Sequence, residues 1–252
     1  MDNAFSLAPG LVEDLRTAQH VTVLTGAGIS AESGLPTFRD PMTGLWAKYR
    51  PEELATPQAF QRNPRLVWDW YAWRRALVAQ AAPNAGHLAL VTLEQHVPHF
   101  TLITQNVDSL HQRAGSKLVI ELHGNISRTK CFGENVVVET WQESDTSPPC
   151  CPRCGNMLRP DVVWFGEQLP EQAFRDAVEA AALCDLFFSI GTSGTVEPAA
   201  SLSRVAQRFG ATVVTINLEV TPLESSQCYA LNGQAGTILP ALVRAAWPEK
   251  GQ

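Results

Sequence analysis

The chain has 252 residues, of which 45% are apolar, enough for one substantial domain with a small appendage. Its 25 acidic residues outnumber its 19 Lys and Arg, for a net charge of -6. This argues against nucleic-acid binding, because neutralising phosphates needs clustered cations. The first ten residues, MDNAFSLAPG, have neither a cationic start nor an apolar core, and no run reaches the roughly 20 apolar residues of a membrane helix. We therefore expect a cytoplasmic protein that binds neither nucleic acid nor membrane.

A strand followed by a glycine turn opens the informative part of the sequence. The apolar, β-branched run Val21 to Leu24 leads into Gly26-Ala27-Gly28, as when a buried strand ends in a phosphate-binding turn. Glycines let backbone N–H groups approach an anion, and the start of the next helix adds unpaired donors. A dinucleotide diphosphate is therefore expected at this turn. Ser33 to Pro36 then ends the helix, and we interpret Thr37 to Asp40 as a mobile flap over the ligand.

An ordinary dinucleotide-binding dehydrogenase has a similar glycine pattern. That class also needs an Asp or Glu about 20 residues further along, where it binds the ribose hydroxyls. Residues 44–50 contain neither a strand pattern nor an acid. The sequence therefore favours a dinucleotide site of another kind.

Strand and helix patterns alternate along the rest of the chain. Such alternation predicts an α/β fold, a Rossmann-like parallel sheet with helices on both faces. In open sheets of this kind, ligands bind beyond the carboxyl ends of the strands, and polar residues or glycine follow each predicted strand. The predicted strands are 21–24, 100–105, 118–122, 186–190 and 211–216, and the predicted helices are 11–19, 57–82, one capped by Asn84, 171–182 and 197–209.

Residues 125–160 interrupt this alternation with prolines, an acidic stretch and cysteines. Four of the six cysteines fall between positions 131 and 154. In a chain without a secretion signal, crowded cysteines indicate metal binding or free thiols more than disulfides. We therefore expect a small inserted Cys-containing module.

Seven motifs follow one another in an order that resembles the sirtuins, which are NAD-dependent protein acyl-lysine deacylases. The similarity runs from about Val21 to Pro240. It implies that the chain consumes NAD as a co-substrate, acts on acyl-lysine proteins or peptides, and releases nicotinamide and O-acyl-ADP-ribose. The motifs are GAGIS at 26–30 with TFRD at 37–40, QNVD at 105–108, HG at 123–124, the Cys-containing insert, VVWFGE at 162–167, GTS at 191–193 and NLE at 217–219.

The resemblance also implies a division of the chain into three parts. Residues 1–124 and 161–252 would form the Rossmann-like NAD-binding domain, and 125–160 a small zinc-type module. Residues 36–85 would be a helical insertion that lines the cleft.

The resemblance implies an NAD site built from five strand ends and the flap. The diphosphate would lie at the glycine turn, and the flap would close over the nicotinamide ribose. The end of the second strand would hold the ribose and the nicotinamide carboxamide, and later loops would hold adenosine. The implied residues are Gly26, Ala27, Gly28, Ile29, Ser30, Thr37, Phe38, Arg39, Asp40, Trp46, Gln105, Asn106, Val107, Asp108, Gly191, Thr192, Ser193, Asn217, Leu218, Glu219 and Ala235.

His123 and Asn106 are the expected catalytic residues. Imidazole, with an ordinary pKa near 6.5, can take a proton near neutral pH. A lone His is more often structural, but His123 directly follows a predicted strand and precedes Gly124. In the sirtuin reaction the amide oxygen of the substrate attacks the ribose carbon that bears nicotinamide. His123 would then deprotonate a ribose hydroxyl, which attacks the acyl carbon.

Tyr71 and Arg74 are expected to select the acyl group. A Tyr-x-x-Arg pair lies at this place in the sirtuin subgroup that prefers acidic acyl chains, and residues three apart share a helix face. Arg holds carboxylates with paired hydrogen bonds, so succinyl and malonyl groups should be favoured while acetyl is still accepted. The resemblance further implies that a backbone strand binds the substrate peptide. Its residues would be Val163, Trp164, Phe165, Gly166 and Glu167.

The cysteine module matches the family less well. Two Cys pairs would give a tetrahedral sulfur site for zinc. Cys151 and Cys154 form the second pair, but the first has only Cys131, and position 134 is Glu. Either Glu134 or Cys150 supplies a fourth ligand, or the site is degenerate and holds no metal.

Two other functions stay open on the sequence. One is transfer of ADP-ribose to protein from the same bound NAD. The other is a non-catalytic NAD-sensing module, against which intact His123 and Asn106 speak. The sequence does not fix the protein targets or the oligomeric state.

Overall fold

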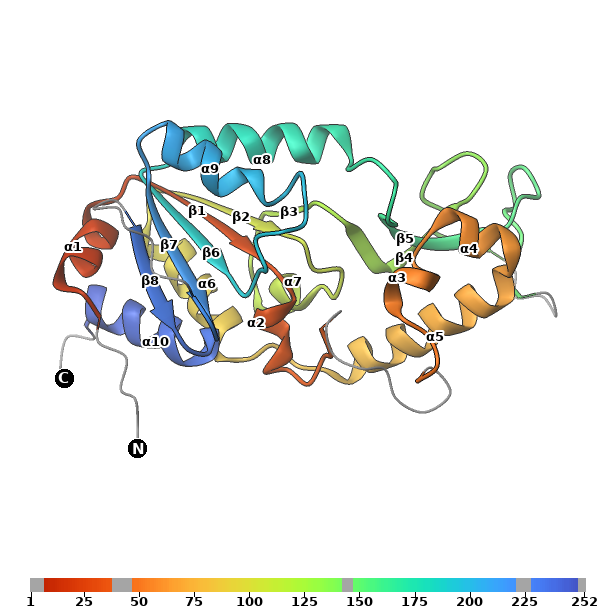
Figure 1. Ribbon diagram of the computed structural model, residues 1–252, viewed down its shortest axis with the longest axis horizontal. Coiled ribbons are helices and arrows are strands. Elements are labelled where there is room, and N and C mark those ends of the chain that lie inside the picture. Colours follow the sequence, from red (N-terminus) through yellow and green to blue (C-terminus); the bar gives the residue numbers. More distant parts are fainter. Residues whose placement is uncertain (1–6, 38–46, 142–146, 221–227, 249–252) are drawn as a thin grey trace.

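A computed structural model describes residues 7–37, 47–141, 147–220 and 228–248. Its main element is a six-stranded sheet in the order β3-β2-β1-β6-β7-β8, and every neighbouring pair is parallel (Figure 1). The predicted Rossmann-like parallel sheet is confirmed. Its strands are β1 (His20–Thr25), β2 (His99–Thr104), β3 (Val119–Glu121), β6 (Leu186–Ile190), β7 (Thr212–Asn217) and β8 (Cys228–Asn232).

Helices cover both faces of this sheet (Figure 1). Successive side chains of a strand point to opposite faces, so Phe188 packs beneath one helical layer and Phe187 beneath the other. Because helices cover both faces, the central strands β1 and β6 are buried along almost their whole length, including polar residues such as Thr22 and Thr25. One layer is α1 (Pro9–Thr17), α6 (Ala85–His96) and α10 (Ala235–Ala246), and the other is α8 (Glu171–Leu183) and α9 (Ser201–Arg208).

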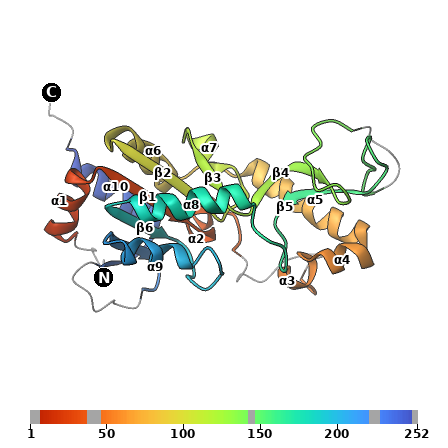
Figure 2. The same ribbon diagram turned by 90° about the horizontal axis from the view of Figure 1, so that it is seen from above.

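A smaller lobe lies at the opposite end of the molecule from α1 (Figures 1 and 2). Its helices and its antiparallel strand pair share one aromatic core around Phe60, Trp70 and Trp164. The division of the chain into the three predicted parts remains a prediction. The elements of the lobe are α3 (Pro51–Leu54), α4 (Pro57–Arg62), α5 (Pro64–Gln80), β4 (Gly124–Cys131) and β5 (Leu158–Val162).

The prediction of one continuous helix over 57–82 is wrong. The segment forms two helices, because Asn63 has non-helical backbone angles, φ -147° and ψ 79°, as expected for a residue that precedes proline. Asn63 then caps α5 by accepting a hydrogen bond from the Leu66 N–H at 3.2 Å. The new start leaves Trp70 and Tyr71 buried side by side on α5.

Other boundaries also differ from the sequence predictions. The helix predicted over 197–209 begins only at Ser201. The sequence analysis predicted neither β8 nor α10, and the interior Pro240 of α10 hides that helix from a pattern search because proline normally ends helices. By contrast, the cap at Asn84 is as predicted, since its side-chain oxygen accepts from the Gly86 N–H at 2.9 Å.

No helix in the described ranges has both the length and the apolar content that crossing a membrane requires. The flap residues Phe38, Arg39 and Asp40, together with Trp46, lie outside the described residues.

Candidate functional site

The site is built on a close contact between the loops that follow β1 and β6. The Gly28 N–H donates to the Gly191 carbonyl at 2.8 Å. A Cβ at Gly28 would lie 2.7 Å from the Gly191 Cα, and a Cβ at Gly26 would lie 2.8 Å from the Gly191 oxygen. Only glycine fits here, so the GAGIS and GTS motifs are two halves of one turn. It lies between adjacent strands at the carboxyl edge of the sheet, where ligands of such folds bind.

A polar network joins α2 (Ala27–Ala31) to the end of β2. The Ser30 hydroxyl donates to Asp108 Oδ2 at 2.7 Å, and the Leu110 N–H donates to Asp108 Oδ1 at 2.9 Å. The Asn106 amide donates to the Gly26 carbonyl at 3.0 Å. The same NH₂ group also donates to the Ser30 hydroxyl at 3.1 Å, so both bonds use the donor half of the amide, and its oxygen is the half that could accept from a ligand.

The ends of β2, β6 and β7 are tied together through Thr192. Gln105 Nε2 donates to the Thr192 hydroxyl at 3.0 Å, and Asn217 Nδ2 donates to the Thr192 carbonyl at 2.9 Å. Three predicted site residues from separate strand ends are therefore linked, with Thr192 between the other two.

His123 follows β3 at a turn that requires glycine next to it. Gly124 has φ +76°, and a Cβ there would lie 2.2 Å from the Asp161 carbonyl oxygen. His123 Nδ1 lies 3.0 Å from the Gln105 carbonyl, and the Val163 N–H donates to the His123 carbonyl at 2.9 Å. The side chain and the backbone of His123 are thus both fixed.

The tautomer of His123 follows from its partner. A carbonyl oxygen only accepts, so Nδ1 carries the hydrogen and Nε2 keeps its lone pair. Burial lowers the pKa of His123, and the hydrogen bond to Gln105 opposes this shift. The ring is therefore neutral near pH 7, with Nε2 ready to accept a proton.

Two further histidines lie behind the site, although the sequence analysis set both aside because neither directly follows a strand. His111 Nε2 is 2.9 Å from the Thr25 hydroxyl, and the His87 and His111 rings are 4.8 Å apart. Burial lowers the pKa of His111 to about 3 and that of His87 to about 4. Both are neutral at physiological pH and fill the space behind β1 and β2. The capping box at Asn84 was the sequence signal for His87.

Asn84 is a third residue whose part in the site was missed. Besides capping α6, its amide donates to the Ile29 carbonyl at 2.7 Å and to the Ser33 hydroxyl at 3.0 Å. Glu32 likewise accepts from the Gly236 N–H at 2.9 Å. These bonds attach the end of α2 to α6 and α10.

Tyr71 and Arg74 lie on α5 with different degrees of burial. The Tyr71 hydroxyl accepts from the Trp164 indole at 3.0 Å, which leaves its own hydrogen to donate. Burial raises the pKa of Tyr71 to about 12, so it stays protonated. Arg74 is half-buried with its guanidinium 5.1 Å from the Trp70 ring centroid. Burial lowers the pKa of Arg74, while Tyr71 and the Asp108 carboxylate oppose this shift.

The segment predicted to bind the peptide has one side turned into the smaller lobe. Trp164 is 1% exposed and stacks under Arg159, whose guanidinium carbon lies 3.2 Å from its ring centroid. Glu167 accepts from Arg159 and from the Trp164 N–H. Trp164 and Glu167 therefore hold the segment in place, and Phe165 is exposed on it.

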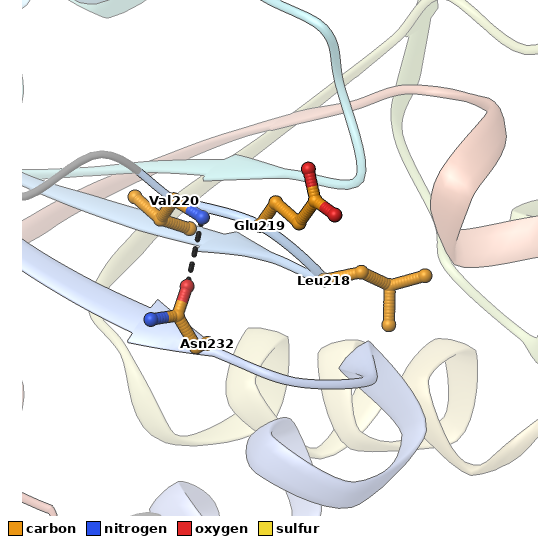
Figure 3. Close-up of a pocket in the computed structure, with 4 residues that line it drawn as sticks. All are labelled: Leu218, Glu219, Val220 and Asn232. Carbon is orange, nitrogen blue, oxygen red and sulfur yellow. Dashed lines mark hydrogen bonds between the residues drawn. The ribbon is translucent and has the colours of Figure 1, made fainter.

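A cavity of about 480 Å³ lies beyond the end of β7, lined by Leu218, Glu219, Val220 and Asn232 (Figure 3). The Val220 N–H donates to Asn232 Oδ1 at 2.8 Å, and the Glu219 carboxylate points away from this bond (Figure 3). Ala235, which was predicted to contact adenosine, is the buried first residue of α10.

Three of the module's cysteines come together as predicted. Cys131, Cys151 and Cys154 form a group with Glu134, and one ligand atom from each lies within 4.8 Å of the others. Thiolates and carboxylates are zinc ligands, so this donor set fits a metal ion. Cys150 is outside the group and exposed.

Comparisons with known proteins agree with this geometry. Residues 26–198 match the model of the Sir2 family. The "NAD-dependent protein deacylase 2" of Pyrobaculum aerophilum is 52% identical over 229 residues, covering 91% of this chain and 92% of that protein.

Solved structures give the same result. A Sir2 homologue in complex with NAD superposes with a TM-score of 0.87 at 43% identity, covering 96% of this chain and 94% of the other. A mutant Sir2 homologue in complex with 2'-O-acetyl ADP ribose gives 0.86 at 44% identity, covering 95% and 96%. With the family model matched from the glycine turn to beyond the GTS loop, the chain belongs to the Sir2 family, the sirtuins.

Proposed function

We propose that this chain is an NAD-dependent protein-lysine deacylase that prefers succinyl and malonyl groups and also removes acetyl groups. The observation that carries the proposal is the fixed, neutral His123, whose Nε2 is basic at the carboxyl edge of the sheet. Beside it lie the glycine turn and the amide of Asn106. The name of the Pyrobaculum relative and the acetyl-ADP-ribose complex of the homologue support the same reaction.

NAD serves as the second substrate, accepts the acyl group on its ribose and loses nicotinamide. The backbone around Gly26 and Gly28 binds the diphosphate, and Asn106 and Asp108 orient the nicotinamide ribose. After the amide oxygen of the substrate has displaced nicotinamide, His123 Nε2 removes the proton from a ribose hydroxyl, so that its oxygen can attack the acyl carbon. Water then completes the reaction, in which the lysine nitrogen leaves as the free amine and the acyl group stays on the ribose. Because Nδ1 is tied to the Gln105 carbonyl, the ring keeps its orientation while Nε2 takes the proton.

The preference for acidic acyl groups rests on Arg74. Its half-buried charge lies in the field of Asp108 and next to Tyr71, and a carboxylate at the end of an acyl chain would compensate the cost of that burial. The Tyr71 O–H hydrogen adds a second donor, because the hydroxyl oxygen already accepts from Trp164. An acetyl group lacks a carboxylate and gains neither bond.

The substrate peptide binds as an added strand beside residues 163–167. Trp164 and Glu167 hold this segment against the smaller lobe. Its N–H groups at positions 163, 164, 165 and 167 already donate within the chain, so the peptide would pair with its carbonyl groups beside the exposed Phe165 ring. Main-chain pairing of this kind tolerates many sequences, which suits an enzyme that acts on lysines of different proteins. In this arrangement helix α5, which carries Tyr71 and Arg74, lines the substrate site.

Replacing His123 should stop the reaction without preventing NAD from binding. His123→Ala is expected to lower the turnover of acyl-lysine peptide at least about 10²- to 10⁴-fold, the usual contribution of a general base. NAD affinity in calorimetric titration should change little, since the diphosphate turn is untouched. Near-normal turnover in this variant would show that His123 is not the base.

Removing the charge of Arg74 should lower activity on succinyl-lysine much more than activity on acetyl-lysine. Arg74→Met is expected to lower kcat/KM for succinyl-lysine peptide about 10- to 150-fold relative to acetyl-lysine peptide, the loss of one charge-linked hydrogen bond. The matched control is Arg75→Met, because the Arg75 guanidinium lies over Trp68 instead. If Arg74→Met lowers both activities equally, Arg74 is structural and the acyl preference is wrong.

Glu219 should exclude NADP at the adenosine end. Its exposed carboxylate lies in the cavity after β7, and it would repel the 2'-phosphate of NADP. We expect Glu219→Gln to raise kcat/KM with NADP relative to NAD roughly tenfold. Glu179→Gln on the outer helix α8 makes the same charge change and should leave the ratio unaltered. An unchanged ratio in Glu219→Gln would place the adenosine ribose elsewhere.

A further inference from the structure

The two turns that supply the metal-ligand group have the same backbone design. In the first, the Asn135 N–H donates to the Cys131 carbonyl at 2.9 Å, and Asn135 has φ +54°. In the second, the Gly155 N–H donates to the Cys151 carbonyl at 2.9 Å, and Gly155 has φ +75°. Each turn therefore runs through four residues and ends in a left-handed residue just after its fourth position.

The equivalence places Glu134 where the second turn has a cysteine. Glu134 is three residues after Cys131, as Cys154 is three residues after Cys151. The Glu134 N–H points at the Cys131 sulfur, 3.4 Å away. The first turn thus keeps the shape of a two-ligand metal turn although its second thiolate is replaced by a carboxylate.

We propose that Glu134 is the fourth ligand of a metal site with three thiolates and one carboxylate. Zn–S bonds of about 2.3 Å and Zn–O bonds of about 2.0–2.2 Å put the corners of a tetrahedron about 3.5–3.8 Å apart. The four ligand atoms here lie within 4.8 Å of one another, and Cys131 Sγ is 3.4 Å from Cys154 Sγ. A zinc-sized ion fits with only a small contraction of the group.

Cys150 is not the fourth ligand in this arrangement. It precedes the second turn, and its backbone pairs with Met157 in an antiparallel bridge. Its side chain is exposed, whereas the adjacent Cys151 is buried in the small core of the module. Neighbouring residues of an extended segment point to opposite sides, so Cys150 points away from the group that contains Cys151.

Arg153 holds the carboxylate from outside the group. Arg153 Nε lies 3.4 Å from Glu134 Oε2, which leaves the other carboxylate oxygen to the metal. Outer-shell partners of this kind orient a ligand and tune its affinity. Three thiolates and one carboxylate carry the same charge as four thiolates, but the oxygen donor is harder. The site should therefore release zinc more readily than a four-thiolate version of itself.

The test uses Co²⁺ bound to the full chain, because sulfur-to-cobalt charge-transfer absorbance rises with each thiolate ligand. Glu134→Cys should raise this absorbance by one thiolate's share and slow the transfer of bound zinc to a chelator. Glu134→Gln should keep the three-thiolate absorbance and weaken metal affinity by at least about tenfold, since even loss of an outer-shell partner costs roughly 10- to 100-fold. Neither readout needs NAD or peptide, so it is independent of the proposed function.

Cys150→Ala is the matched control and should leave both the spectrum and the affinity unchanged. Arg153→Ala should weaken affinity less than Glu134→Gln does, and far-ultraviolet circular dichroism of each variant checks that the chain is folded. Loss of a thiolate band in Cys150→Ala, with no effect of Glu134→Gln, would overturn the assignment. Failure of the unaltered chain to bind Co²⁺ would overturn the site itself.

Discussion

The site depends on one backbone contact, the approach of Gly28 to Gly191 between the loops that follow β1 and β6. A side chain at either position would collide with the other loop, so this contact fixes both glycine motifs at once. It also fixes the glycine turn to which the end of β2 is bound, since Asn106 donates to the Gly26 carbonyl and Asp108 accepts from the Ser30 hydroxyl. The carboxyl ends of the neighbouring strands then have to meet at the same edge, because β1 and β6 are adjacent in a parallel sheet.

The contacts of His123 show how other parts of the fold position the residues at this edge of the sheet. A carbonyl at the end of β2 sets its tautomer, and Gly124 turns the chain toward β4, where Asp161 comes too close for any side chain. The position of His123 therefore depends on the smaller lobe as well as on the large sheet. The same lobe carries Tyr71 and Arg74 on α5, and the metal-ligand group lies around a second, separate small core.

The sequence predicted the strands that carry the site because each is a short apolar run followed by glycine or polar residues. The prediction failed where contacts between distant parts of the chain determine the secondary structure. β8 is stabilised by pairing with β7, and α10 by packing on α6. The interior Pro240 also made the helical pattern of α10 hard to recognise. His111 gave no local signal because only the fold brings it to Thr25. The sequence also showed no sign of the Trp164 hydrogen bond to Tyr71, because the two residues lie 93 positions apart in the chain.

The central claim is that acyl transfer to NAD, rather than ADP-ribosylation of protein, takes place at His123. The most direct measurement is mass spectrometry of all products after incubation with NAD and a succinyl-lysine peptide. The account predicts one nicotinamide and one O-succinyl-ADP-ribose for each lysine freed, and no reaction without NAD. ADP-ribose attached to protein or peptide, with the succinyl group intact, would contradict it.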